Sequence, residues 1–176
     1  GDRILIEEFL DGPECSIFAI TDGVEYVYTP PIRDYKRRYK DNEGPNTGGM
    51  GAIFPIPEYT NELMQSVCHK IITPVISEMY RRGCPFRGVL YTGLALTSKG
   101  PKVVEFNARF GDPEVLVAMP MIDEDIFDLM TRAATNNIPE TRPAKWGKGA
   151  CACVVAVHDG YPESSSKGKI IYNAEQ

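Results

Sequence analysis

One stretch, residues 103–114, does most to limit what this chain can fold into and what it can bind. It begins with the β-branched Val103 and Val104, which favour a strand. Successive side chains of a strand point to opposite faces, so Glu105 and Asn107 are predicted to share one face. A carboxylate and an amide oxygen held in this way can bind a hard cation such as Mg²⁺, which takes few protein ligands and adds water and phosphate oxygens.

An arginine and a helix start follow this pair. Arg109 offers a planar fork of donors that matches phosphate geometry. Asp112 and Pro113 predict the beginning of a helix, with proline at the first helical position. A lone E-x-N pattern is also typical of a polar edge strand that runs into a capped helix. The longer pattern E-x-N-x-R-x-G-D-P-E favours a site for metal and phosphate.

A second candidate anion site is the glycine-rich segment 44–52, which reads G-P-N-T-G-G-M-G-A. Closely spaced glycines let backbone amides approach an anion. The basic residues Lys36, Arg37 and Arg38 precede the segment and favour a phosphate nearby. No Gly-Lys-Ser/Thr ends it, so it is not a P-loop. A plain flexible turn and a solvated run of charge stay open as alternatives.

Around these segments the sequence predicts an α+β fold. Alternating and β-branched residues predict strands over 4–10, 14–20, 24–29, 86–97 and 101–106. The turns at Asp22-Gly23 and at 98–100 pair neighbouring strands antiparallel. A long helix is expected between Thr60, its N-cap, and Gly83, with a kink at Pro74. Two shorter helices are expected at 115–119 and 126–134.

The last part of the chain is expected to begin a second domain. Residues 139–148 look like a linker, in which Trp146 is a packing anchor, and a new strand is predicted over 149–157. The predicted domains are therefore 1–145 and 146–176. The chain begins with Gly1 and apolar residues follow almost at once, which indicates a piece of a larger polypeptide.

Composition excludes several classes of partner. The net charge of −5 predicts no nucleic-acid footprint and no basic membrane patch, and no apolar run approaches a membrane span. The five cysteines include no C-x-x-C pair, and Cys151 and Cys153 are expected to be buried thiols. This pattern fits a reducing cytoplasm.

Taken together, the motifs resemble those of the ATP-grasp superfamily, and within it the phosphoribosylamine–glycine ligase family. The segments that carry the resemblance are 6–12 with Glu14, 34–37, 44–52 and 104–114, and the likeness runs over nearly the whole chain. It implies an ATP-grasp large subdomain, an antiparallel sheet flanked by helices, followed by the start of a C-terminal β-rich domain. The family's N-terminal domain and lid, the rest of its polypeptide, would be partners of this chain.

The resemblance also implies a reaction. Such enzymes ligate glycine to 5-phosphoribosylamine in purine biosynthesis, through a glycyl phosphate made with ATP and Mg²⁺ or Mn²⁺. The implied partners are thus small molecules, with neither nucleic acid nor membrane. Without the lid and the N-terminal domain, the chain alone is expected to be inactive.

Residue roles follow from the same resemblance. The adenine hinge would be Glu7, Glu8, Phe9 and Leu10, and Glu14 would accept from the ribose hydroxyls. Glu105 and Asn107 would bind the metal, Arg109 would stabilise the transferred phosphoryl group, and Asp112 would steer the substrate amine. Phosphoribosylamine and the acyl phosphate would face Asp34, Lys36, Asn46, Thr47, Gly48, Gly49, Met50 and Gly51.

The sequence departs from the family pattern at three places. The strand segment 91–94 carries no acid, so only two protein ligands to the metal are expected. Tyr35 stands where the family commonly has histidine. The turn at 158–162 reads H-D-G-Y-P, where the family usually has G-G-Y-P. Another ATP-grasp carboxylate–amine ligase and a nucleotide-binding module without catalysis remain alternatives.

Overall fold

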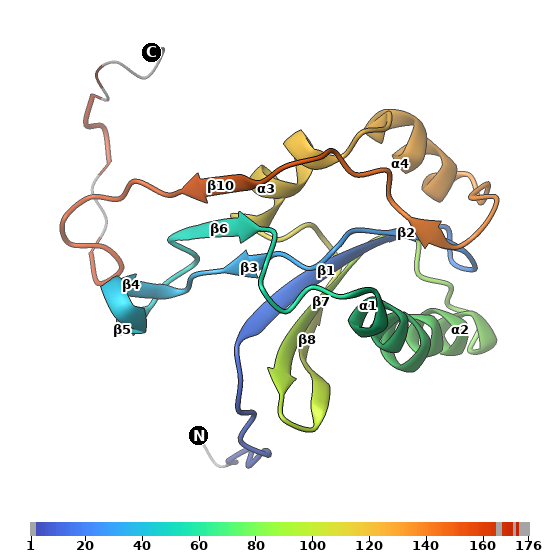
Figure 1. The fold of residues 1–176 in the computed structure, drawn as a ribbon, viewed down its shortest axis with the longest axis horizontal. Helices are drawn as coiled ribbons and strands as arrows, with labels where there is room; N and C mark the ends of the chain where they lie inside the picture. The colour runs from blue at the N-terminus through green and yellow to red at the C-terminus, as the bar shows by residue number, and fades with distance from the viewer. Residues whose placement is uncertain (1–2, 165–166, 171, 173–176) are drawn as a thin grey trace.

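The computed structural model of the chain describes residues 3–164, 167–170 and 172. Its centre is a five-stranded sheet in the order β8-β7-β1-β2-β9 (Figure 1). Neighbouring strands are antiparallel except β2 and β9, which run parallel. The strands are β1 (Glu14–Thr21), β2 (Tyr26–Tyr28), β7 (Gly88–Thr97), β8 (Gly100–Asn107) and β9 (Arg142–Pro143). The predicted antiparallel pairs are confirmed, although β2 is shorter than the expected strand 24–29.

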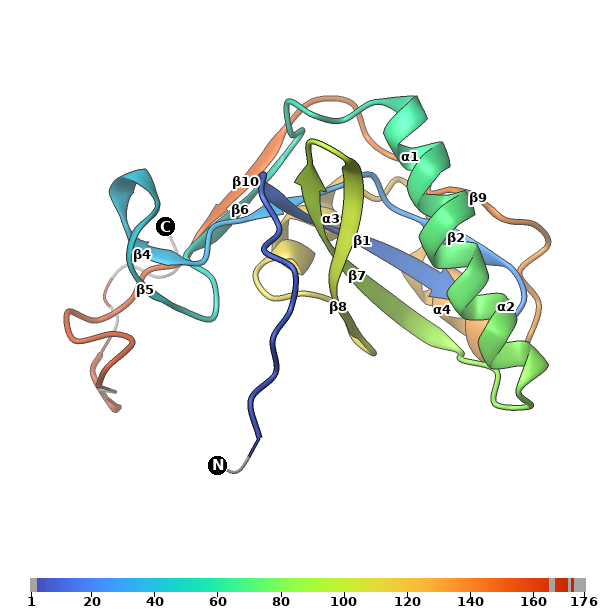
Figure 2. The same ribbon diagram turned by 90° about the horizontal axis from the view of Figure 1, so that it is seen from below.

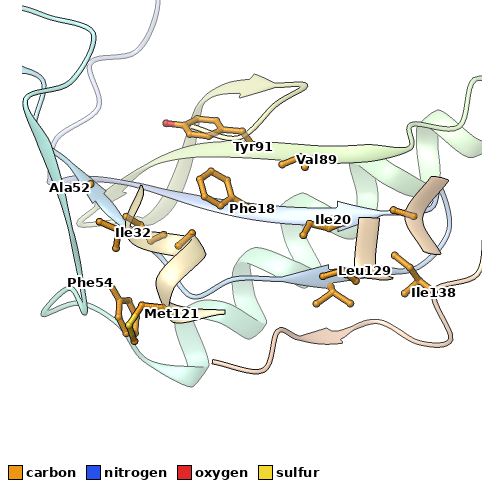
Figure 3. Close-up of a cluster of buried hydrophobic side chains, with 14 residues drawn as sticks. Phe18, Ile20, Ile32, Ala52, Phe54, Val89, Tyr91, Met121, Leu129 and Ile138 are labelled. Carbon is orange, nitrogen blue, oxygen red and sulfur yellow. The ribbon is translucent and has the colours of Figure 1, made fainter. Parts of the chain in front are cut away.

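Helices cover both faces of this sheet, so β1 is buried at every position except Glu14. Ile17 and Ala19 pack on the side of α1 and α2, whereas Phe18 and Ile20 pack on the side of α3 and α4. Alternate side chains of β1 thus pack into two hydrophobic cores, one on each face of the sheet. Figure 3 shows the second core, where Phe18 lies beside Tyr91.

One face is covered by the long helix that the sequence predicts. It consists of α1 (Asn61–Val67), a π-helical turn (Cys68–Ile72) and α2 (Thr73–Arg81), which lie in line as one rod in Figure 2. The Thr60 hydroxyl accepts from the Leu63 amide at 3.1 Å, so the predicted N-cap is confirmed. Pro74 has no N–H to donate to the preceding turn, and the helix widens there instead of bending sharply.

The other face is covered by α3 (Glu114–Met121) and α4 (Ile126–Ala134). Asp125 caps α4 by accepting from the Asp128 amide at 3.0 Å. Pro113 is the N-cap of α3 rather than its first helical residue, so the helix begins at Glu114. Trp146 packs edge-on against Phe54, with ring centroids 5.1 Å apart, and is the packing anchor that the sequence predicts.

Smaller sheets extend from one end of the central sheet and carry the glycine-rich segment (Figure 1). A three-stranded sheet has the order β10-β6-β3, and β4 pairs with β5 in a hairpin. Their bounds are β3 (Arg33–Asp34), β4 (Arg37–Tyr39), β5 (Glu43–Asn46), β6 (Gly51–Phe54) and β10 (Cys151–Val154), with a 3₁₀ turn η1 (Lys40–Asn42) joining β4 and β5. Because β10 pairs with β6, it is tied to the first part of the chain, and the domain boundary after residue 145 stays a prediction.

The predicted strand over residues 4–10 is wrong. The segment is extended but pairs with no other strand of the described residues, and Ile4, Leu5, Ile6 and Phe9 are each at least 80% exposed. A strand needs a neighbour to take its backbone hydrogen bonds, and β8, the nearest edge, pairs only with β7. The ion pair between Glu8 and Lys102, at 2.9 Å, is the contact that the segment makes with β8.

Within the described residues, no helix has both the length and the apolar character needed to cross a membrane. All five cysteines are free thiols. Cys15 is buried in the sheet, whereas Cys151 and Cys153 are half-buried against the core under α3, so their predicted burial is only partial.

The two-faced burial of β1 predicts a large loss of stability on truncation. Phe18→Ala removes a fully buried ring and should lower the free energy of unfolding by about 3–5 kcal/mol. Phe127→Ala, in which the ring is 79% exposed on α4, should change it by less than about 0.5 kcal/mol. Urea unfolding of both variants measures the difference, and equal losses would contradict the described core.

Candidate functional site

The candidate site lies where β8 ends at the edge of the central sheet. Asn107 Nδ2 donates to Glu105 Oε1 at 3.1 Å, so the two side chains lie together as the alternation predicts. Across the ladder, Asn107 faces Tyr91 and Glu105 faces Gly93. The neighbouring strand therefore adds no acid here.

This pair fits a divalent cation that takes few protein ligands. It offers carboxylate and amide oxygens on an edge strand, with Glu105 exposed and Asn107 half-buried. Among the residues that the structure describes, no group of three or more His, Cys, Asp or Glu is arranged to hold a metal ion. The arrangement suits Mg²⁺ or Mn²⁺, whose remaining positions are filled by water and phosphate oxygens.

Beside this pair, charged residues from β1 and β3 converge on one small pocket. Lys36 Nζ lies 3.0 Å from Glu14 Oε2, and both line the pocket with Asp34, Glu105 and Glu114. Burial alone would lower the pKa of Lys36, but the hydrogen bond that Lys36 donates to Glu14 and the charges of Glu14, Asp34 and Glu105 raise it. Lys36 therefore stays cationic at neutral pH and offsets part of the negative charge.

Asp34 is the carboxyl group with the most perturbed titration in this pocket. Its Oδ1 is buried and has no protein partner among the described residues. Burial, followed by the charge of Glu114, raises the pKa of Asp34 from its ordinary value of 3.8 to about 7, although Lys36 opposes the shift. Asp34 can therefore hold or release a proton near neutral pH.

Glu114 is a residue that the sequence argument did not assign to the site. It is only 2% exposed, and its Oε1 accepts from Ser16 Oγ at 3.1 Å and from Tyr91 Oη at 3.0 Å. Burial and the charge of Glu114 raise the pKa of Tyr91, which keeps that hydroxyl protonated as a donor. Acids are common in the first turn of a helix, so the residues around Glu114 do not by themselves indicate that its carboxylate is buried in the site.

The glycine-rich segment folds as a short loop at 47–50, because its first residues form β5 and Gly51 begins β6. Gly49 has φ +123°, and a Cβ there would run into Pro113 and approach Asp34 Oδ1 to 3.2 Å. The loop tip thus lies against both Asp34 and the turn that follows Asn107. Glycine is needed at this position because of the φ angle and of the close approach.

The backbone amides of this loop do not form an open cradle. All four donate within the protein: Thr47 N to Lys36 O at 2.7 Å, Gly48 N to Tyr161 Oη at 3.1 Å, Gly49 N to Thr47 Oγ1 at 3.1 Å and Met50 N to Tyr35 O at 2.7 Å. The expectation that these amides face an anion directly does not hold for the loop in this conformation. Three of the four partners, on Lys36, Tyr161 and Tyr35, lie elsewhere in the chain and could not be inferred from the loop sequence itself.

A cavity of about 690 Å³ opens on the other side of Glu14. It is lined by Glu14, by Arg33–Arg37 of the β3–β4 segment, and by the β4–β5 hairpin with Asn46. Four cations lie along it, Arg33, Lys36, Arg37 and Lys40, together with three acids, Glu14, Asp34 and Asp41. Its size and its basic side chains suit a phosphorylated small molecule.

Several predicted site residues lie apart from this cluster. Glu7, Glu8 and Phe9 are exposed on the extended segment and line neither pocket, and Leu10 is half-buried. Arg109 is exposed and donates to the carbonyl of Phe110 at 2.8 Å, and Asp112 is exposed on the same turn. The roles expected for all these residues stay predictions.

Comparisons with known proteins point to one family. The profile of the family described as phosphoribosylglycinamide synthetase, ATP-grasp (A) domain, matches residues 1–115. The phosphoribosylamine–glycine ligase of Streptomyces coelicolor is 44% identical over 99% of this chain. The chain spans 42% of the length of that relative.

Solved structures agree. The crystal structure of the phosphoribosylamine–glycine ligase from Thermotoga maritima has a TM-score of 0.82 and 33% identity, over 92% of this chain and 40% of that one. The biotin carboxylase domain of the Hydrogenobacter thermophilus 2-oxoglutarate carboxylase, solved with MgADP, has a TM-score of 0.54 and 13% identity. It covers 83% of this chain and 30% of that chain, and this likeness shows the fold alone.

The pocket electrostatics predict that Glu114→Gln lowers the pKa of Asp34 from about 7 toward its ordinary value, because a charge is removed while the hydrogen-bond acceptor is kept. Carbon NMR titration of the Asp34 carboxyl measures the change. Glu78→Gln, on the exposed end of α2, is the control and should leave that pKa unaltered. An Asp34 pKa that does not move in Glu114→Gln would contradict the assignment of Glu114 as a source of the shift.

The same shift predicts how stability depends on pH. As the pH rises from about 4 to about 7, the unfolded carboxyl ionises first while folded Asp34 keeps its proton, so unfolding becomes more favourable over this window. Asp34→Asn removes the effect, and the melting temperature of the variant relative to the natural chain should rise by a few degrees between these pH values. A difference that stays constant from about pH 4 to about pH 8 would contradict the prediction.

Proposed function

Since the chain belongs to the phosphoribosylglycinamide synthetase ATP-grasp domain family, we propose that it forms the ATP-grasp part of a phosphoribosylamine–glycine ligase. The observation that carries the proposal is the contact of the loop tip at Gly49 with Asp34 and Pro113. This contact joins the glycine loop to the strand end that bears Glu105 and Asn107. Two motifs far apart in the sequence therefore meet at one site.

The proposed reaction has two steps. A carboxylate oxygen of glycine attacks the γ-phosphorus of ATP, the bond to the β-phosphate oxygen breaks, and ADP leaves. The amine nitrogen of 5-phosphoribosylamine then attacks the carbonyl carbon of glycyl phosphate. A C–N bond forms, the C–O bond to phosphate breaks, and the amine gives up a proton. Protein groups contribute mainly by positioning the reactants and balancing charge.

We assign the divalent cation to Glu105 and Asn107. Their contact on an exposed strand edge supports this assignment, since the remaining coordination positions are open to phosphate oxygens and water. Enzymes of the ATP-grasp family use ATP with divalent metals, and Mg²⁺ or Mn²⁺ suits this oxygen donor set. When bound, the cation neutralises charge on the phosphates.

The other roles rest on placement and charge. Lys36 would face phosphoribosylamine and the acyl phosphate, and Glu14, paired with it, would accept from the ribose hydroxyls of the nucleotide. Both residues line the cavity and the small pocket, which supports these roles. Asp34, with its pKa near neutral, would take the proton that the amine releases. Arg109 would turn from the Phe110 carbonyl to the transferred phosphoryl group, and Asp112 on the same turn would steer the amine.

The hinge role of Glu7, Glu8, Phe9 and Leu10 also belongs to this proposal. Their extended, exposed backbone leaves N–H and C=O groups available to an adenine edge. The partners proposed for the chain are glycine, phosphoribosylamine, ATP and the additional domains found in its longer relatives. The free thiols support a reducing compartment such as the cytoplasm.

Titration of Mg·ATP into the chain by calorimetry tests the metal assignment. Glu105→Ala should weaken binding by roughly tenfold or more, because a charged ligand of the cation is lost. Glu62→Ala, an exposed acid on α1, is the matched control and should bind as the natural chain does. Binding that Glu105→Ala leaves unchanged would refute the assignment.

A ligation assay tests the reaction itself. A chain extended to the full length of its relatives should form glycinamide ribonucleotide from glycine, phosphoribosylamine and Mg·ATP, whereas residues 1–176 alone should not. Glu105→Gln in the extended chain should abolish most of the turnover. Product formation from another amine or carboxylate in preference to these substrates would overturn the proposed function.

A further inference from the structure

The glycine loop has an unexpected partner in the last part of the chain. Gly48 N–H donates to Tyr161 Oη at 3.1 Å, although the two residues are 113 positions apart. A Cβ on Gly48 would lie 3.4 Å from the same oxygen, so the phenol rests directly on the loop backbone. The H-D-G-Y-P turn, which the sequence marks only as a departure from the family's G-G-Y-P turn, therefore forms one wall of the loop.

This turn is held rigidly by its own bonds. His158 Nδ1 accepts from the Gly160 amide at 3.1 Å, and Nε2 of the same ring lies 2.8 Å from Ser164 O. The ring of Tyr161 packs edge-on to that of His158, and Arg38 Nε donates to the backbone oxygen of Tyr161 at 2.8 Å. The position of the hydroxyl is thus fixed from both sides of the turn.

The hydroxyl has a proton to give. A phenol that accepts from an N–H still carries its own O–H, and accepting one bond strengthens the one that it donates. No group in residues 3–164, 167–170 or 172 accepts this proton. All four amides of residues 47–50 are already paired. The hydroxyl of Tyr161, which lies against the loop, is therefore the group beside it that can still donate a hydrogen bond.

A cation lies beside the residue that carries this hydroxyl. Arg38 is half-buried, donates to the backbone oxygen of Tyr161, and follows Lys36 and Arg37, which line the large cavity; the turn itself also carries the acids Asp159 and Glu163. A hydroxyl donor that lies next to cations forms a stronger hydrogen bond to a phosphate oxygen than to an uncharged acceptor.

We propose that Tyr161 is a substrate-binding residue whose hydroxyl, held by Gly48, donates its proton to an oxygen of the phosphate-bearing substrate at the glycine loop. The proposal rests on the proposed function for the identity of that substrate, a phosphorylated sugar. It gives the turn at 158–164 a direct part in the site. It also explains how the loop can take an anion while its amides are occupied.

The test uses ribose 5-phosphate as a stable probe, titrated into the nitrogen-15-labelled chain and followed by amide chemical shifts. Tyr161→Phe keeps the ring and removes the hydroxyl, and it should bind the probe roughly tenfold more weakly. The Gly48 amide should be among the signals that shift on binding to the natural chain. Equal affinity of Tyr161→Phe and the natural chain would overturn the proposal.

Two further variants separate donation from mere support of the loop. Ser164→Ala removes the Ser164 Oγ bond to Gly160 O, at 3.2 Å, and leaves the Tyr161 hydroxyl in place, so it should bind the probe as the natural chain does. Site-specific 3-fluorotyrosine at position 161 makes the hydroxyl a better donor and a poorer acceptor. At about pH 6 it should bind ribose 5-phosphate more tightly, and weaker binding would overturn donation.

Failure of this inference can be told apart from failure of the proposed function. If the natural chain binds Mg·ATP in a manner that depends on Glu105 but does not bind ribose 5-phosphate, the role of Tyr161 is overturned and the proposed function stands. If the probe binds through Tyr161 while Mg·ATP binding is insensitive to Glu105, the metal assignment fails and the Tyr161 site remains.

Discussion

The carboxylate of Glu114 joins three elements at the point where the candidate site is built. It belongs to the first residue of α3 and accepts from Ser16 on β1 and from Tyr91 on β7. A buried carboxylate is stable only when its oxygens are hydrogen-bonded, so these two hydroxyls are required partners rather than additional ones. A side chain on Gly111 would collide with the carboxylate, and this fixes the turn between the strand end and the helix.

From this anchored turn, the remaining parts of the site follow. Pro113 meets the loop tip at Gly49, and Asp34 lies against the same glycine. Burial and then the charge of Glu114 raise the pKa of Asp34 to about 7, while Lys36 opposes the shift. Glu114 thus contributes both to the shape of the pocket and to the protonation of Asp34.

Much of the fold could be predicted because its signals are local. The alternation of β1, the Asp22-Gly23 turn and the cap at Thr60 depend on residues close in sequence, and the structure confirms them. The strand over 4–10 failed because a strand depends on a neighbour that sequence alone does not provide. The likeness to the family could be recognised from motif order, and the family profile and relatives agree with it.

The parts of the site that escaped prediction are those made by distant contacts. Glu114 looks like an ordinary helix start until Ser16 and Tyr91 are seen to surround it. The loop amides look free until their partners, of which Tyr161 is the most remote, are known. Burial and pairing of polar groups are tertiary properties, and a motif can indicate the chemistry of a site without showing which donors are available.

We propose that the end of β8 and the glycine loop form one site for a metal-bound nucleotide. Paramagnetic broadening by Mn·ADP in the nitrogen-15-labelled chain distinguishes one joint site from two separate ones. The amides of Glu105, Asn107 and Gly49 should lose intensity first, while those of α2 should remain sharp. Broadening centred on α2, or broadening at the strand end with none at the loop, would rule out a joint site.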